Sequence, residues 1–378
     1  MIEYVDRAGS NCVKWDSECS CGLLPLWVAD MDFKAAAPIL AALQRRLNHG
    51  AFGYEFVPQA YYDAVSNWFD RRHGWHGISR EQIIYTTSVV AGISAVLRAM
   101  TKPGDGVVVQ TPAYNCFFSC LNNLECRLLD SPLIEKEAHY EVDWESFEAQ
   151  VRQAKVFLLC NPHNPTGRVW TREELARMAA ICEQHGVFVI ADEIHCEFTF
   201  PGIAYTPYAT IAQTKNYCVC CSPSKAFNLA GLHCANIIVP DKEHYQRIDK
   251  AVNIHEVCEL NPFGVEALMA AYNESETWLD ELQLLLYANY RYLCDVMREQ
   301  MPMLTVTRAE GTYLAWVNVT ALGIPSEALC QQLAAQEKVL FNPSEMYGGK
   351  GYIRINLATS REILTEALHR LHRFICSL

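Results

Sequence analysis

The chain has 378 residues, 51% of them hydrophobic and 20% charged, and a formal net charge of −12. This balance excludes disordered, collagen-like and coiled-coil proteins, and the length predicts two domains. The acidic excess, without a basic stripe, argues against nucleic acid as a partner. Because no apolar run reaches the roughly 18 residues of a membrane span and no signal peptide is recognisable, we expect a cytoplasmic protein without a membrane partner.

Seventeen cysteines are the unusual feature of the composition. Their odd number, in a long chain without an export signal, predicts reduced thiols rather than a disulfide framework. The closest groups are Cys19/Cys21 and Cys218/Cys220/Cys221, and neither has the C-x-x-C spacing of a zinc site. We therefore expect buried thiols and no metal.

Short β-branched runs alternate with helical stretches in the middle of the chain, which is typical of a mostly parallel sheet in an α/β domain. The predicted strands are Ile83–Thr87, Gly106–Gln110, Val156–Cys160, Val187–Ala191, Tyr217–Cys221 and Ala235–Val239. A capping box of Thr171 and Glu174 begins one helix between them. Further on, apolar spacing predicts a long helix from Glu274 to about Met301, followed by strand-like pieces at Tyr313–Val319 and Gly351–Asn356. These later elements indicate a second, smaller α+β domain.

Polar motifs follow several of these strands, at the edge where open α/β sheets bind ligands. Lys225 follows a strand in the motif Ser222-Pro-Ser-Lys, and desolvation there would make its amine a nucleophile able to form a Schiff base. Asp192 ends another strand, where a buried carboxylate needs a cationic partner. Taken singly, the lysine motif also suits an ordinary solvated lysine, and the aspartate also suits a helix cap.

Three further motifs complete this edge. Two Asn-Pro steps in Asn161–Gly167 predict an irregular loop that can aim the Asn164 amide at a ring oxygen. The segment Thr86–Gly92 enters a helix, whose free N–H groups form a phosphate site or an ordinary cap. Tyr114 places an aromatic ring just past another strand. Together the five motifs provide for a phosphorylated pyridine aldehyde, which is pyridoxal 5′-phosphate (PLP).

At this point the chain resembles a fold-type I PLP enzyme of the class I/II aminotransferase superfamily, and more closely the MalY/PatB branch of cystathionine β-lyases. The resemblance covers nearly the whole chain. It is carried by Lys14–Asp16, Leu26–Phe33, Phe52–Tyr54, Arg71–Trp75, Asn161–Gly167, Asp192–His195, Ser222–Gly231 and Arg354–Asn356. It implies an aspartate aminotransferase-like fold, with a large PLP-binding domain at 46–275 and a small domain made of 1–45 and 276–378.

The resemblance also implies a role for each matching residue. Lys225 would hold the cofactor and shuttle a proton, Asp192 would pair with the pyridine nitrogen, and Asn164 and His195 would bond the ring hydroxyl. Tyr114 would stack on the ring, while Ser222 and the amides of Val89 and Val90 would hold the phosphate. Tyr54 would reach the phosphate from the other subunit of a homodimer with shared sites, and Arg354 would clamp the substrate carboxylate.

Two positions depart from the pattern of these families. His233 stands where the superfamily often has an arginine that assists the phosphate, and Ser88 replaces the glycine usual at the start of the phosphate loop. Both departures bear on phosphate binding.

The expected reaction is α,β-elimination of a thiol from cystathionine or a related cysteine conjugate, leaving pyruvate and ammonia. Transamination uses the same catalytic set and remains the alternative, because fold and cofactor do not determine the reaction. A regulatory protein that binds a partner protein and keeps PLP only structurally is a third possibility.

Overall fold

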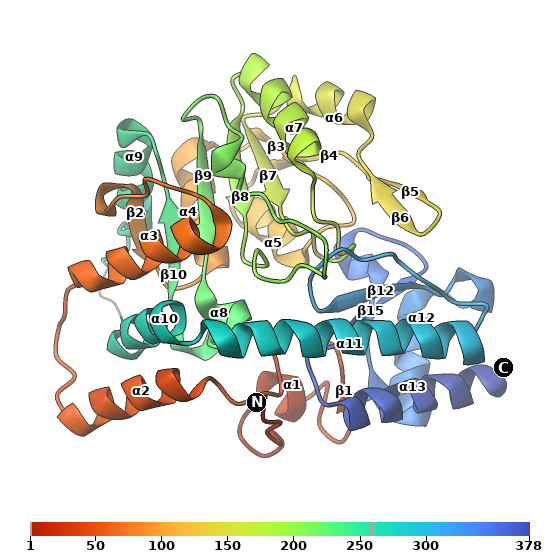
Figure 1. The fold of residues 1–378 in the computed structure, drawn as a ribbon. Coiled ribbons are helices and arrows are strands. Elements are labelled where there is room, and N and C mark those ends of the chain that lie inside the picture. The colour runs from red at the N-terminus through yellow and green to blue at the C-terminus, as the bar shows by residue number, and fades with distance from the viewer. Residues whose placement is uncertain (1, 257–260) are drawn as a thin grey trace.

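The computed structural model describes residues 2–256 and 261–378. A seven-stranded sheet forms its centre, in the order β2-β10-β9-β8-β7-β3-β4 (Figure 1). The strands are β2 Ile83–Thr86, β3 Gly106–Val109, β4 Arg127–Asp130, β7 Val156–Cys160, β8 Phe188–Asp192, β9 Tyr217–Cys221 and β10 Ala235–Ile238. Only β10 runs against the common direction of the other six strands of this sheet. The predicted mostly parallel α/β sheet is confirmed, and β4 is the strand that was not predicted.

Alternation along each strand sends side chains into two separate hydrophobic layers. Phe157, Val189 and Val219 face one layer, which also contains residues of α3, α7 and α10. Leu158, Ile190 and Cys218 face the other layer, with residues of α4, α5 and α9. These helices are α3 Gln59–His73, α4 Val89–Met100, α5 Asn115–Asn123, α7 Arg172–Gln184, α9 Lys242–Val252 and α10 Pro262–Glu274. Both faces of the sheet are therefore buried, as continuous apolar strands require.

A second, antiparallel sheet has the order β11-β12-β15-β14. Its strands are β11 Thr305–Val306, β12 Leu314–Asn318, β14 Asn342–Pro343 and β15 Tyr352–Asn356. Two further pairs of short strands are β1 Leu24–Pro25 with β13 Val339–Leu340, and β5 Ile134–Lys136 with β6 His139–Glu141. The remaining helices are α1 Val13–Asp16, α2 Ala37–His49, α6 Trp144–Val151, α8 Pro223–Ala226, α11 Glu276–Gln300, α12 Ser326–Gln332 and α13 Arg361–Cys376.

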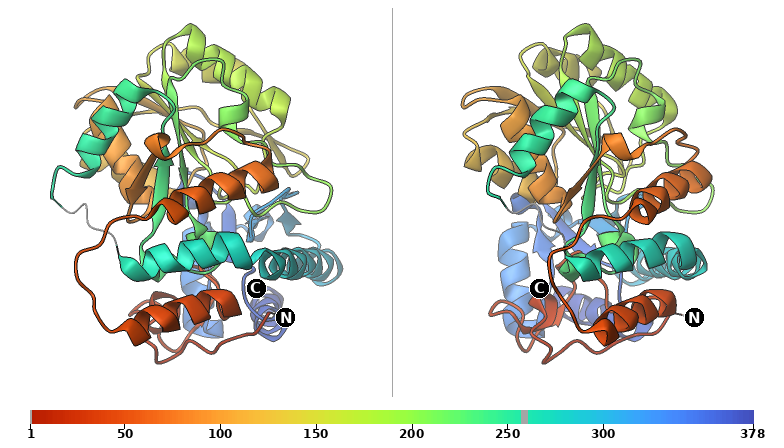
Figure 2. Two further views of the ribbon diagram at one scale, coloured as in Figure 1. Left: turned by 60° about the vertical axis from the view of Figure 1, so that its left-hand side comes forward. Right: turned by 90° about the vertical axis from the view of Figure 1, so that its left-hand side faces the viewer.

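The long helix α11 connects the two cores, close to its predicted bounds. Leu279, Leu282 and Leu286 pack into the core of the large sheet, whereas Leu293 and Met297 pack into the core of the small one. Helix α10 lies between α2 and α3 beside it (Figure 2). The N-terminal segment also contributes to both cores, with Met31 and Phe33 in the large one and Leu24 and Leu26 in the small one. The division at residues 45 and 275 stays a prediction.

The sixteen cysteines among the described residues carry free thiols, most of them buried, and Cys258 lies outside those residues. No helix in the described part of the chain combines the length and apolar character needed to cross a bilayer.

Candidate active site

A cavity opens where β7, β8 and β9 end, at the edge that the motifs predicted. Its lining includes Cys160 at the end of β7, Asp192 at the end of β8 and Ser222 just after β9. The other predicted site residues in the lining are Val89, Val90, Tyr114, Asn164, His195 and Lys225. The structure thus gathers eight of the ten predicted site residues around one cavity, Arg354 joins them through a hydrogen bond, and Tyr54 does not.

Lys225 lies in the short helix α8, with its amine next to a backbone carbonyl. Its Nζ donates to the carbonyl oxygen of Ala29, which lies far away in the sequence. Burial lowers the pKa of Lys225, and the carboxylate of Asp30 partly opposes this effect. A lowered pKa makes the neutral, nucleophilic amine more populated near neutral pH, as covalent attachment to an aldehyde requires.

Asp192 is a buried carboxylate that lacks a cationic partner within hydrogen-bond range among the described residues. Its side chain receives one hydrogen bond, from the Ile194 amide at 3.2 Å. Burial raises the pKa of Asp192 to about 7. A buried carboxylate is stable when a cation pairs with it, and a protonated ring nitrogen supplies one.

Two polar side chains lie beside this carboxylate. Burial lowers the pKa of His195 to about 3, so its imidazole is neutral, and its Nδ1 is buried without a hydrogen-bond partner among the described residues. Asn164 is 3% exposed and its Oδ1 accepts a hydrogen bond from Arg354 at 3.1 Å. The unpaired His195 nitrogen can bond to a further polar group placed in the cavity.

The N-terminus of α4 supplies free amides to the same cavity. Ser88 caps the helix, and its Oγ accepts from the Ala91 amide at 3.1 Å. The amides of Val89 and Val90 carry no hydrogen bond to any described residue. Unpaired amides at a helix N-terminus form an anion site. The φ of Ser88 is −161°, which any residue adopts, so the helix start does not require the glycine of related proteins.

Ser222 and His233 differ in their relation to the cavity. The Ser222 hydroxyl lines it, although it donates to the Cys234 carbonyl at 2.6 Å and accepts from the Ser224 amide at 3.0 Å. It can donate to a bound phosphate only by giving up the bond to Cys234. His233 is exposed and does not line the cavity, so it does not take over the contact of the missing arginine.

Arg354, on β15, brings the small sheet to the site. The residue is 4% exposed; its guanidinium carbon lies 4.7 Å from the centre of the Tyr347 ring, and the guanidinium donates to Asn164 and to the Trp27 carbonyl at 2.8 Å. No described carboxylate pairs with it, and its Nε has no partner among the described residues. A buried guanidinium without a counter-charge is suited to bind a carboxylate from outside the chain.

The two predicted tyrosines have different positions. Tyr114 lines the cavity just before α5, where its ring can stack on a planar ligand. Tyr54 is 94% exposed, in the segment between α2 and α3, and it does not line the cavity of its own chain.

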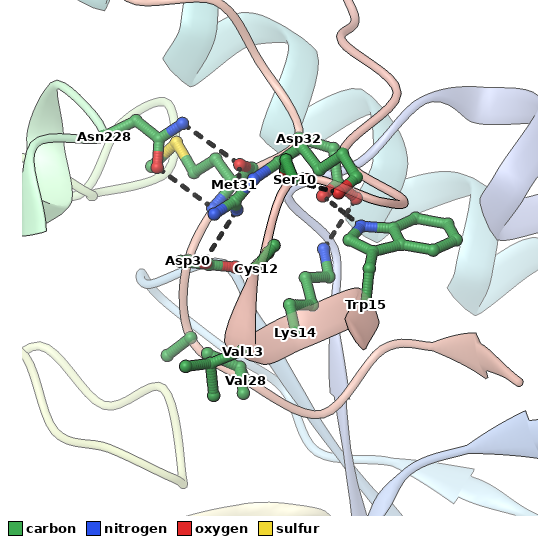
Figure 3. A network of polar contacts seen from close by, with 12 residues as sticks. Ser10, Cys12, Val13, Lys14, Trp15, Val28, Asp30, Met31, Asp32 and Asn228 are labelled. Atoms are coloured by element: carbon green, nitrogen blue, oxygen red, sulfur yellow. Dashed lines mark hydrogen bonds and ion pairs between the residues drawn. The ribbon is translucent and has the colours of Figure 1, made fainter. Parts of the chain in front are cut away.

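Sequence reasoning missed the role of residues 27–31, which we call the N-terminal strap. Its carbonyls accept hydrogen bonds from the side chains of the site: Trp27 from Arg354, Ala29 from Lys225 and from the Tyr313 hydroxyl at 3.2 Å, and Asp30 from Asn356 at 2.8 Å. Figure 3 shows Val28, Asp30 and Met31 of the strap near Lys14 and Asn228. The resemblance includes this segment through Leu26–Phe33, but its residue types gave no signal of these contacts, because the contacts use its backbone.

A second network, also missed, supports the turn that follows His195. The Glu197 carboxylate accepts from Trp68 Nε1 at 2.7 Å, pairs with His73 at 2.8 Å and with Arg72 at 2.8 Å. Burial alone would raise its pKa, but His73 and Arg72 outweigh burial and lower the pKa to about 2. Arg72 also bonds Glu276 at 2.9 Å, so the network ties the turn to α3 and α11. His73, Cys196 and Glu197 lie close enough together to hold a metal ion. The Glu197 carboxylate is already bonded to Trp68, His73 and Arg72, however, which leaves it little capacity for a metal.

The cavity fits PLP, as three of its unpaired groups show. Asp192 lacks a cation, His195 Nδ1 lacks a partner, and the first amides of α4 are free. These groups match the ring nitrogen, the ring hydroxyl and the phosphate of the cofactor, and the Lys225 amine matches its aldehyde.

Comparison with known proteins agrees with this geometry. The sequence profile of the family described as aminotransferase class I and II matches residues 32–371. Cystathionine beta-lyase PatB of Bacillus subtilis is 36% identical over 97% of both chains, and protein MalY of Escherichia coli is 33% identical over 97% of this chain and 96% of its own. The PLP-bound C-S lyase of Staphylococcus hominis is 31% identical, with a TM-score of 0.93 over 99% of this chain and 97% of that one. The chain belongs to the class I and II aminotransferase family of PLP-dependent proteins, within which it groups with the cystathionine β-lyases.

Proposed function

We propose that this protein is a PLP-dependent carbon–sulfur lyase. It would cleave L-cystathionine or related cysteine S-conjugates to a thiol, pyruvate and ammonia. The observation that carries the proposal is the meeting, at one cavity, of a lysine amine, a buried carboxylate and a buried guanidinium without a counter-charge. The name of the Bacillus subtilis relative supports elimination of a thiol as the reaction.

The residues of this chain can then be given roles in the reaction. Bound PLP supplies an electron sink that makes the Cα proton of an attached amino acid acidic. The Nζ of Lys225 removes that proton, because burial lowers its pKa and leaves it able to accept one. Asp192 keeps a proton on the ring nitrogen. The electrons left at Cα form a double bond to Cβ as the C–S bond breaks, and the thiolate leaves with the bonding pair. Water then hydrolyses the released aminoacrylate to pyruvate and ammonia.

Other residues hold the reactants in place. Arg354 exchanges its bonds to Asn164 and Trp27 for the substrate carboxylate, which frees Asn164 for the ring hydroxyl beside His195. The amides of Val89 and Val90, with Ser222, hold the phosphate. Tyr114 covers one face of the ring.

The assay mixes holoprotein with L-cystathionine and measures pyruvate and free thiol. We expect equal amounts of both from the wild type and none from Lys225→Ala. Lys215→Ala, which removes an exposed lysine before β9, is the matched control and should keep full activity. Borohydride reduction followed by peptide mass spectrometry should place the cofactor on Lys225. Cofactor on another lysine, or activity in Lys225→Ala, would contradict the assignment.

An aminotransferase is the second candidate, because the matching family carries that name. It would use the same residues but return a proton to the cofactor instead of expelling a thiol. Glutamate formed from 2-oxoglutarate, without pyruvate from cystathionine, would favour it over the lyase.

We also propose a cytoplasmic homodimer with shared active sites. Phe52, Tyr54 and Phe56 are 53%, 94% and 83% exposed in one short segment, which is unusual for three aromatic side chains. Tyr54 of each subunit would reach the phosphate held by the other. Light scattering should give twice the mass of the chain, and Tyr54→Phe should weaken PLP binding without changing the mass. A monomeric holoenzyme with full activity would refute this arrangement. The free thiols support a reducing compartment.

A further inference from the structure

A groove beside the cofactor cavity contains an ion pair that has no role in the proposed elimination. The groove and the cavity share Ala230, and Asp30 in the groove follows Ala29 in the lining of the cavity. The carbonyl oxygen of Ala29 accepts the hydrogen bond from the Lys225 amine. The groove therefore begins next to the reactive amine.

The pair consists of Arg7 and Asp30, which connect the first residues of the chain to the N-terminal strap. Arg7 Nη1 lies 2.7 Å from Asp30 Oδ2 and also donates to the Met31 carbonyl at 3.0 Å. The other carboxylate oxygen, Asp30 Oδ1, is buried without a hydrogen-bond partner among the described residues. The Asp30 carboxylate also acts on the Lys225 amine, whose pKa burial lowers and Asp30 raises. Asp30 thus has one oxygen fixed and one available.

Asp30, Arg7 and Asp6 keep unused hydrogen-bonding capacity in the groove. Among the described residues, Asp6 accepts from the Ala8 amide at 3.0 Å through one carboxylate oxygen only, whereas Lys34 pairs with Glu3 at 3.1 Å. The Asn228 side chain accepts from the Met31 amide through Oδ1 and donates to the Met31 carbonyl through Nδ2, so both ends of its amide are used. Arg7 makes both its bonds through Nη1, so Nε and Nη2 have no partner in the described part of the chain. The groove therefore offers two carboxylates, of which Asp30 directly follows the cavity-lining Ala29, next to the donors of Arg7.

We propose that this groove is the subsite for the charged end of a zwitterionic thiol leaving group. Asp30 Oδ1 accepts from its ammonium group and Arg7 donates to its carboxylate. The proposal rests on the lyase function and adds the residues that select the leaving group, Arg7 and Asp30. A fixed pair of opposite charges binds such a group better than a neutral or singly charged one.

Four substrates that differ only in this end test the proposal in the holoenzyme: L-cystathionine, S-(3-aminopropyl)-L-cysteine, S-(3-carboxypropyl)-L-cysteine and S-propyl-L-cysteine. Asp30→Asn should lower kcat/KM about 10- to 100-fold more for the two substrates with a distal ammonium than for S-propyl-L-cysteine. Arg7→Gln should do the same for the two substrates with a distal carboxylate. Glu3→Gln, which removes an exposed acid of the same segment, is the control and should change none.

An equal loss for all four substrates would overturn the proposal, because Asp30 would then only hold the strap in place. No change in any of them would overturn it too. Dissociation constants, measured from the visible absorption of the cofactor, separate this subsite from the lyase function. If the wild type releases no thiol but Asp30→Asn still weakens binding of the ammonium-bearing ligands alone, the subsite stands and the lyase function falls.

Discussion

Replacing Lys14 by methionine should destabilise the protein strongly, because it breaks an ion pair without any exposure to water. Lys14 Nζ lies 2.6 Å from Asp32 Oδ2, and both side chains are 0% exposed. The other oxygen of Asp32 accepts from Trp15 Nε1 at 2.9 Å (Figure 3). Methionine fills the volume of the lysine stem but leaves the carboxylate buried without a cation. Removal of one partner of such a pair costs about 3–5 kcal/mol.

That free energy converts into a measurable change in Tm. With an unfolding entropy of about 2.1 cal/mol/K per residue, the 378 residues predict a fall of about 4–6 °C in Lys14→Met. Differential scanning calorimetry of the holoprotein measures it. Lys34→Met is the matched control, since its pair with Glu3 is exposed on both sides, and it should shift Tm by less than about 1 °C.

A double variant separates the two possible origins of the loss. Lys14→Met combined with Asp32→Asn removes the charge but keeps an oxygen that can accept from Trp15. If the buried Asp32 carboxylate without a cation causes the loss of stability, the double variant should be more stable than Lys14→Met alone. A further fall in Tm in the double variant, or no fall in the single one, would refute this reasoning.

The other predictions concern the cavity and its support. Arg354→Lys should raise KM for the amino acid about 10-fold or more with a smaller effect on kcat, since a lysine cannot form the paired contact; an unchanged KM in steady-state assays would exclude this role. The pKa of Asp192 lies above its usual 3.8 without cofactor, so the native state binds more protons between about pH 4 and about pH 7. Raising the pH through this range should therefore lower the Tm of the cofactor-free wild type relative to Asp192→Asn, whereas a constant difference in thermal scans would contradict the shift. Glu197→Gln should lower Tm by several degrees and slow turnover through His195, and a stable variant with normal kcat would show that the network does not position the turn.

The elements that the sequence predicted well are those whose own residues determine them. The apolar runs of β7 and β9 are buried throughout, and their predicted bounds agree with the structure. Strand β4 was missed because Arg127, Leu128 and Asp130 are exposed at the sheet edge, so it lacks a continuous apolar run. Its pairing with β3 comes from the backbone. Edge strands are therefore hard to find from hydrophobic pattern alone.

The candidate site shows the same limit. Lys225, Asp192 and Asn164 follow strands of one sheet, so their order along the chain predicts that they meet. The contact of Arg354 with the Trp27 carbonyl joins residues 327 positions apart, and one partner is a backbone atom. Every residue has such a carbonyl, so the sequence contains nothing that distinguishes this one. The resemblance predicted Arg354 as a substrate ligand but could not predict what holds it in place.

The carbonyls of the N-terminal strap explain how the site can change partners without losing its shape. Ala29 accepts from Lys225 and from Tyr313, and Trp27 accepts from Arg354 and from Asn342 at 3.0 Å. In the proposed reaction Lys225 turns to the cofactor and Arg354 to the substrate, and each carbonyl then keeps its second donor. Tyr313 and Asn342 therefore hold the strap while the two reacting side chains leave it. This arrangement also keeps Asp30, one residue beyond Ala29, fixed beside the site, as a subsite for the leaving group requires.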